Sequence, residues 1–71
     1  MLRRSNADEL LELFAKLSPI QQTILHLRFA RDLSTREIAQ LVQKSDGAVR
    51  TLLSRTLNSL RNMYERRKEG E

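Results

Sequence analysis

The sequence contains no cysteine and no tryptophan, and His26 is its single histidine. Without cysteine the chain has neither a disulfide framework nor a thiolate metal site, and one histidine leaves few nitrogen ligands for a metal ion. We therefore expect no metal and no cofactor. The absence of disulfides is also compatible with a reducing cytoplasm.

Long apolar runs are absent as well. No stretch approaches the roughly 20 consecutive apolar residues that a membrane-spanning helix needs. The residues after Met1-Leu2-Arg3-Arg4 are polar, unlike the apolar segment of a signal peptide. We expect a soluble, cytoplasmic protein that makes no membrane contact.

The chain is also short and poor in aromatic residues. Its 71 residues can enclose one modest core, and only 4% of them are aromatic. Leu, Ile, Val and Ala packed between helices must therefore form the core of a single domain, residues 1–71, with an ordered part of about 6–64. The almost wholly charged tail, residues 65–71, is expected to fray into solvent. With 13 Lys plus Arg against 9 Asp plus Glu, the charge of +4 favours polyanionic partners.

Capping signals and apolar periodicity predict the first two helices. Ser5 or Asn6 can begin a helix that ends near Leu17, with apolar residues at helical spacing: Leu10, Leu13, Phe14 and Leu17. Ser18 as N-cap, Pro19 in the first turn and Gln21 three residues after the cap form a capping box. This second helix is expected to end around Arg31 or Asp32. Its apolar residues predict that neighbours cover most of its circumference: Ile20, Ile24, Leu25, Leu27 and Phe29.

The second half of the chain predicts a helix-turn-helix. Ser34-Thr35-Arg36-Glu37 repeats the capping box and opens a short helix, in which Ile38, Ala39, Leu41 and Val42 can face the core. After a break at Gln43-Lys44, Ser45 caps a fourth helix, and Asp46 places a carboxylate at its positive end. An apolar stripe carries this helix past Leu60: Val49, Leu53, Thr56, Leu57 and Leu60. The predicted fold is an all-α, compact four-helix domain with a helix-turn-helix formed by the last two helices.

The outer face of the fourth helix suits DNA. At about 100° per residue, the positions opposite Val49 carry small polar groups: Gly47, Thr51, Ser54 and Asn58. Arg50 and Arg61 flank this face on one side, and Arg55 on the other. Short side chains let the backbone approach a groove, and arginine reaches guanine edges or phosphates. Arginines on an exposed helix are often simply solvated. The arginines here directly follow a helix-turn-helix break, however, and this position favours DNA contact.

Two other features of the sequence bear on its function. Leu52 lies about 60° and Leu57 about 80° from the core axis of this helix, so these leucines either widen the buried stripe or contact a partner. The sequence assembles no nucleophile with a base and an orienting group, and it has no Gly-rich phosphate loop. We therefore expect that the protein is not an enzyme.

The motifs of the chain resemble region 4 of sigma-70 family factors, most closely those of the extracytoplasmic-function group. The resemblance covers roughly residues 7–63 and rests on a series of segments: Leu17-Ser18-Pro19, Leu27-Arg28-Phe29, Leu33-Ser34, Glu37-Ile38-Ala39, Gly47-Ala48-Val49-Arg50 and Leu60-Arg61. It implies a four-helix unit that contacts the minus-35 element of double-stranded promoter DNA with its last helix and docks on the beta flap of RNA polymerase. Anti-sigma factors are frequent partners of this family.

Carried over by position, the resemblance implies a set of DNA-binding residues: Arg36, Lys44, Ser45, Gly47, Arg50, Thr51, Ser54 and Arg55. The chain departs from the family pattern at several places. Asp32 stands where the family usually has glycine after the second helix, and Gln43-Lys44 replaces the common pair of a glycine and a hydrophobic residue in the turn. Leu52 and Leu57 stand where many sigma factors carry basic residues, which favours weaker DNA binding or a protein partner.

Two alternatives remain open from the sequence. LuxR-type output domains share the pattern that precedes the recognition helix, but they usually lack the arginine found here at Arg28 and end the last helix earlier. A standalone sigma-like module could instead bind polymerase or an anti-sigma factor without recognising a promoter, and Leu52 and Leu57 would then belong to its partner surface.

Overall fold

The fold is described by a computed structural model that covers residues 6–69, with side chains for residues 8–67. Its elements are α1 (Asn6–Ala15), α2 (Pro19–Leu25), the π-helical turn η1 (His26–Ala30), α3 (Thr35–Val42) and α4 (Asp46–Glu69). Residues 6–69 contain no strand, so the predicted all-α class with a helix-turn-helix formed by α3 and α4 is confirmed. Within the same residues, no helix is both long and apolar enough to cross a membrane.

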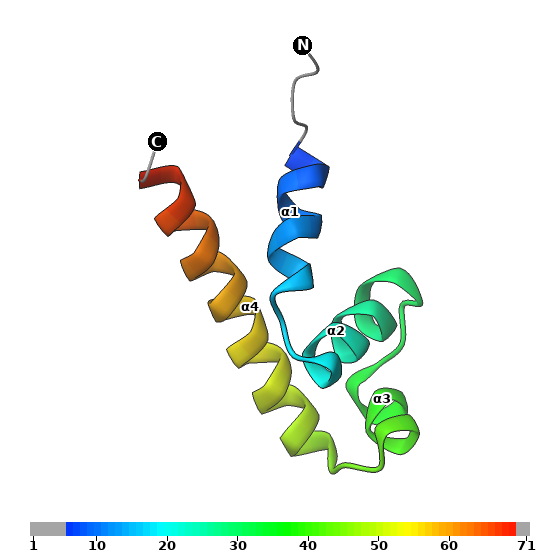
Figure 1. Ribbon diagram of the computed structural model, residues 1–71. Coiled ribbons are helices and arrows are strands. Elements are labelled where there is room, and N and C mark those ends of the chain that lie inside the picture. The colour runs from blue at the N-terminus through cyan, green and yellow to red at the C-terminus, as the bar shows by residue number, and fades with distance from the viewer. Residues whose placement is uncertain (1–5, 70–71) are drawn as a thin grey trace.

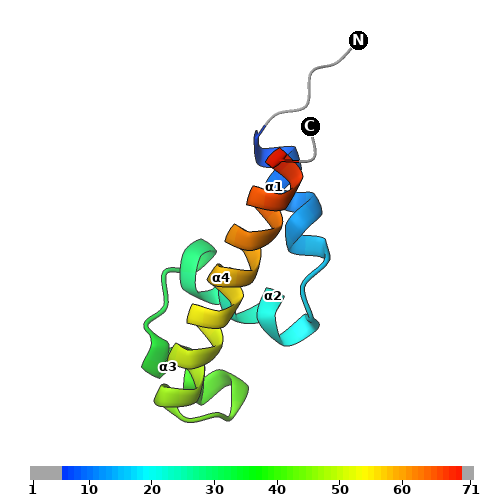
Figure 2. The same ribbon diagram turned by 90° about the vertical axis from the view of Figure 1, so that its left-hand side faces the viewer.

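The long helix α4 organises the domain. Its 24 residues contact α1, α2 and α3. As Figure 1 shows, α3 lies beside the first turns of α4, whereas α1 lies beside its later turns. The start of α1 and the end of α4 share one end of the molecule (Figure 2). The beginning of α4 and the whole of α3 therefore occupy the opposite end.

The core forms where α2, α3 and α4 meet. Ile24, Ile38 and Val49 are each 0% exposed, and Leu17, Leu25, Ala39 and Leu53 complete the buried cluster. Thr56 is also 0% exposed, and its hydroxyl donates to the carbonyl oxygen of Leu52 at 2.7 Å. This bond satisfies a polar group that would otherwise be costly to bury. Aliphatic side chains from three helices thus make the core that the composition predicts.

Two expectations about the core are wrong. Leu41 is 63% exposed. The inner face of α3 is formed by Ile38, Ala39 and Val42, and Leu41 lies on the outer face. Phe29 is 62% exposed, because its side of η1 faces an open groove and not a neighbouring helix.

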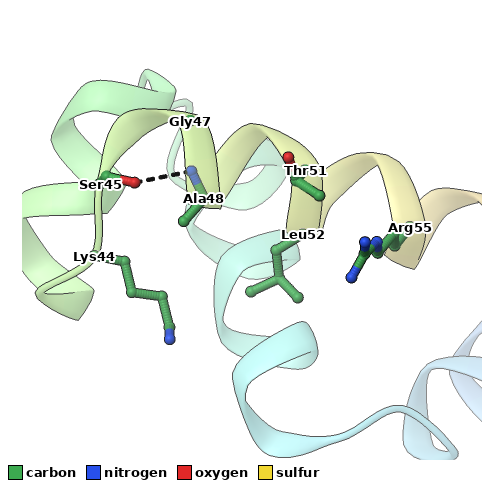
Figure 3. Close-up of a pocket in the computed structure, with 7 residues that line it drawn as sticks. All are labelled: Lys44, Ser45, Gly47, Ala48, Thr51, Leu52 and Arg55. Atoms are coloured by element: carbon green, nitrogen blue, oxygen red, sulfur yellow. Dashed lines mark hydrogen bonds between the residues drawn. The ribbon is translucent and has the colours of Figure 1, made fainter.

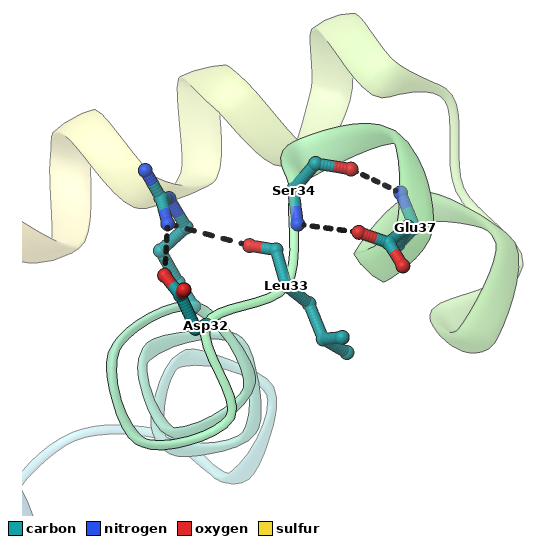
Figure 4. Close-up of polar contacts among 5 residues, drawn as sticks. Asp32, Leu33, Ser34 and Glu37 are labelled. Carbon is teal, nitrogen blue, oxygen red and sulfur yellow. Dashed lines mark hydrogen bonds and ion pairs between the residues drawn. The ribbon is translucent and has the colours of Figure 1, made fainter.

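The serine caps predicted at Ser18, Ser34 and Ser45 are present, whereas Ser5 lies outside the described residues. Ser18 and Gln21 form one capping box, in which the Ser18 N–H donates to Gln21 Oε1 at 3.0 Å. Ser34 and Glu37 form the other, with the two reciprocal bonds at 3.0 and 3.1 Å (Figure 4). Ser45 Oγ accepts the N–H of Ala48 at 3.1 Å. Hydrogen bonds of Glu37 with the backbone N–H and with the side chain of Ser34 hold the pKa of the Glu37 carboxyl below its ordinary value.

The loop before α3 depends on Arg28 and Asp32. Arg28 Nη1 donates to the carbonyl oxygen of Leu33 at 3.4 Å and lies 3.7 Å from Asp32 Oδ1. Asp32 has φ 55, in the left-handed region that aspartate tolerates better than most residues. Helix α2 ends at Leu25, and η1 continues the helical segment to Ala30, close to the predicted end at Arg31. The Arg31 N–H donates to the His26 carbonyl oxygen at 3.2 Å.

The turn between α3 and α4 also uses a left-handed residue. Gln43 has φ 58 and ψ 45, and the N–H of the following Lys44 donates to the carbonyl oxygen of Ala39 at 3.0 Å. This is the C-terminal cap geometry that glycine favours. Gln43 therefore adopts a left-handed conformation that is unfavourable for a residue with a side chain, but the turn still forms.

Replacing Gln43 by glycine is expected to stabilise the domain by about 0.5 to 1 kcal/mol, because glycine adopts the left-handed conformation without a Cβ penalty. Chemical denaturation of the two proteins measures the difference. The matched control is Gln40→Gly, at an exposed position inside α3, where glycine should instead destabilise by a similar amount. Destabilisation by both substitutions would contradict the strain assigned to Gln43.

The C-terminal segment differs from its prediction. Helix α4 continues to Glu69, and the Arg67 guanidinium forms an ion pair with Glu12 of α1. The prediction that the charged tail frays into solvent is therefore wrong for residues 65–69, which are helical. The reason is tertiary, because α1 runs beside the last turns of α4 and supplies the carboxylate. Residues 70 and 71 lie outside the described part of the chain.

Candidate nucleic-acid interface

A contact between first turns joins the two helices of the helix-turn-helix. Thr35 begins α3, and its hydroxyl donates to Asp46 Oδ1 at 2.6 Å. Asp46 begins α4, where its carboxylate also meets the positive end of the helix dipole. The same carboxylate thus stabilises the start of α4 and connects it to α3.

The outer face of α4, which the sequence predicts to contact DNA and which we call the recognition face, lies in solvent. Gly47, Thr51, Ser54 and Asn58 are all exposed, as the helical spacing predicts. A Cβ built on Gly47 would have no atom within 4 Å from the rest of the described protein. Packing within the domain therefore does not require glycine at this position. Its missing side chain instead leaves the backbone of α4 open to close approach from outside.

An open hollow lies at the start of α4 (Figure 3). Its lining brings together Lys44, Ser45, Gly47, Ala48, Thr51, Leu52 and Arg55. The aliphatic side chain of Leu52 lies between the cationic side chains of Lys44 and Arg55 (Figure 3). Five of the eight residues expected at DNA line this hollow, whereas Arg36, Arg50 and Ser54 lie outside it.

Arg50 belongs to the same face but has a partner of its own. Its side chain is 71% exposed, and its Nε lies 3.2 Å from Asp46 Oδ2, one turn earlier in α4. Arg36 on α3 and Arg55 on α4 are likewise exposed. Sequence reasoning assigned Asp46 only to the helix end, and the contact with Arg50 was missed. The signal was available, since Asp46 and Arg50 have the i, i+4 spacing that favours ion pairs.

A second surface was not predicted. An apolar groove runs between α1, η1 and α4, lined by Leu10, Leu11, Phe14, Leu25, His26, Phe29, Ala30, Leu57 and Leu60. Leu11 is 64% exposed and Leu57 44% exposed. We call this surface the apolar groove. Large exposed apolar patches on a small domain are typical of protein interaction sites.

The two leucines left undecided by the sequence have different surroundings. Leu52 is half-buried, packs against the core and borders the hollow at the start of α4. Leu57 is more exposed and lines the apolar groove.

Among the described residues, no group of three or more His, Cys, Asp or Glu side chains is placed to hold a metal ion.

The fold and the exposed face of α4 together define a helix-turn-helix domain of the DNA-binding class. Residues 13–62 match the family described as Sigma-70, region 4. The chain belongs to this family and is a sigma-factor DNA-binding domain involved in transcription regulation. The family is one of DNA-binding domains and not of enzymes. This match favours the sigma-like interpretation over the LuxR-like one.

A relative supports the same assignment. The chain is 41% identical over 56 residues, 79% of its length, to the ECF RNA polymerase sigma factor BldN of Streptomyces coelicolor. The predicted resemblance to the extracytoplasmic-function group is therefore confirmed. The chain spans 21% of the length of that relative. No solved structure matches the chain.

Proposed function

We propose that this domain recognises the minus-35 element of promoters with α4 and docks on the beta flap of RNA polymerase during transcription initiation. The observation that supports it is the recognition face, where small polar side chains lie in solvent directly after the turn from α3. Such a face admits the helix to the major groove, which is wide enough for an α-helix. A role at promoters implies a cytoplasmic protein.

The DNA-facing residues divide by chemistry. Arg50 and Arg55 are the long donors that can reach guanine edges, and Thr51 and Ser54 can donate to or accept from bases or phosphates. Arg36 and Lys44 add positive charge beside the major groove of the DNA. Ser45 and Gly47 are small, so they let the protein backbone approach the DNA. With so few cations, the isolated domain should bind DNA weakly and with a steep dependence on salt concentration.

The apolar groove is the surface we assign to the beta flap. Its exposed leucines and Phe29 lie on α1, η1 and the middle of α4, and none of them lines the hollow at the start of α4. A polymerase segment with an apolar face can therefore occupy the groove while the first turns of α4 remain free for DNA. An anti-sigma factor that covers the same groove would compete with the flap.

Two titrations at one moderate salt concentration test the proposal. The first measures binding of a beta-flap fragment, and the second selects preferred sequences from random duplex DNA. Flap binding with an enriched, non-palindromic hexamer supports the proposed function. Enrichment of a palindrome without flap binding would instead indicate a LuxR-like dimeric regulator.

The apolar groove itself favours one further candidate function, a module that binds polymerase or an anti-sigma factor without recognising a promoter. Leu57 stands at a position where many sigma factors carry a basic residue, and it adds apolar surface to the groove. Flap binding without any sequence enrichment would support this candidate over promoter recognition.

Replacing Phe29 by serine is expected to weaken flap binding about tenfold or more, because the apolar groove then loses a large exposed aromatic ring. Folding stability should change little, since the ring is 62% exposed. Leu41→Ser is the matched control, because Leu41 is 63% exposed but lies outside the apolar groove. Equal loss in both variants, measured by fluorescence titration, would contradict the assignment of the groove.

A further inference from the structure

The geometry points to Asp46 as a positioning residue that orients Arg50 for base recognition. This inference rests on the proposed function, because it concerns how a residue of the recognition face selects DNA sequence. Asp46 uses both carboxylate oxygens. Oδ1 accepts the hydroxyl of Thr35 at 2.6 Å, and Oδ2 lies 3.2 Å from Nε of Arg50.

The nitrogen that Asp46 contacts determines what Arg50 can still do. A guanidinium has five N–H donors, one on Nε and four on the two terminal nitrogens. The contact to Asp46 uses the Nε edge of the Arg50 guanidinium. The terminal nitrogens remain as the pair of parallel donors that the O6 and N7 acceptors of guanine require. Asp46 can therefore hold Arg50 without occupying the donors that would contact a base.

Thr35 makes the arrangement more than a surface ion pair. The Arg50 side chain is 71% exposed, and exposed ion pairs at i, i+4 spacing restrict a side chain only weakly. The Asp46 side chain, however, is 34% exposed and is bonded to a residue of another helix. Because α3 fixes the carboxylate through Thr35, the position of Arg50 depends on the relation between the two helices of the helix-turn-helix.

The charge of Asp46 gives the inference a distinctive signature. A carboxylate at the start of a DNA-facing helix repels phosphates, so its removal should strengthen binding to all DNA sequences. If Asp46 also orients Arg50, the same removal should reduce discrimination between sequences. Affinity for random DNA and sequence preference would then change in opposite directions, which a loss of folding cannot produce.

The experiment uses the whole chain and two duplexes, the selected preferred sequence and the same duplex with the Arg50-dependent base pair exchanged. The ratio of their dissociation constants is measured for wild type, Asp46→Asn and Thr35→Val. We expect the ratio to fall about fivefold in Asp46→Asn, the lower end of one bidentate base contact. In Thr35→Val, which leaves the charge unchanged, we expect a fall of about twofold.

The matched control is Glu65→Gln, which removes the same charge from α4. Glu65 pairs with Arg61 at 3.3 Å with the same i, i+4 spacing, far from the start of the helix. Its ratio should remain that of wild type. In an Arg50→Ala background, Asp46→Asn should lower the ratio no further, because the residue it orients is gone.

Three outcomes would overturn the inference. A wild-type protein without sequence preference would remove the proposed function together with it. A ratio that falls in Arg50→Ala but not in Asp46→Asn or Thr35→Val would leave the proposed function standing and overturn only the role of Asp46. A ratio that Asp46→Asn lowers equally with and without Arg50 would show that Asp46 acts through another residue.

Discussion

Replacing Ile38 by alanine is expected to lower the free energy of unfolding by about 2 to 5 kcal/mol. The side chain is 0% exposed and belongs to the cluster in which α2, α3 and α4 meet. Its removal leaves a cavity that three helices must line. A domain of this length has a total stability of roughly 4 to 11 kcal/mol, so a large share of it depends on this one residue. Because Ile38 holds α3 in place, DNA binding should decline with folding.

Leu41→Ala is the control for Ile38→Ala. Both residues lie on α3, but Leu41 is 63% exposed, and its truncation should change stability by no more than about 0.5 kcal/mol. Urea denaturation measures both variants through the midpoint, with the slope checking that unfolding remains two-state. Similar losses at both positions would mean that α3 packs differently from the structure described here.

Replacing Arg50 by alanine is expected to weaken DNA binding selectively, by about 1 to 3 kcal/mol at one or two base pairs. Arg50 is the exposed arginine nearest the start of α4, and its contact to Asp46 leaves the terminal nitrogens for a base. Titrations against a series of duplexes, each with one base pair exchanged, measure the effect position by position. Stability should change little, since the side chain is 71% exposed.

Arg66→Ala is the matched control for Arg50→Ala, because Arg66 is also an exposed arginine of α4 but lies near its other end. It should leave the preferred sequence unchanged. A loss in Arg50→Ala that is equal on every duplex would assign Arg50 to phosphate contact and not to base recognition.

Local chemistry made much of the fold predictable. Ser18, Ser34 and Ser45 begin helices because their hydroxyls accept backbone N–H groups of the first turn, and this depends only on residues within the same turn. The exposure of the recognition face followed from helical periodicity once Val49 was taken as the core direction. Asp32 adopts the left-handed conformation that its short polar side chain allows.

The positions that sequence reasoning misplaced depend on neighbours that periodicity does not specify. Leu41 and Phe29 are apolar residues at the margins of helical stripes, and only the docking of the helices decides whether a margin is covered. Both are exposed here, and Phe29 lines the apolar groove. Arg67 was expected in a solvated tail, but α1 brings Glu12 to it from the other end of the chain.

The sequence by itself determined the helices, their caps, the helix-turn-helix and the membership in the sigma-70 region 4 family, because these rest on local spacing and short-range hydrogen bonds. Only the tertiary structure decided which side chains from different helices meet. It placed Thr35 of α3 against Asp46 of α4 and left the apolar groove open between α1, η1 and α4. Both features arise from the packing of helices against one another, which depends on the shapes of all the faces in contact at once.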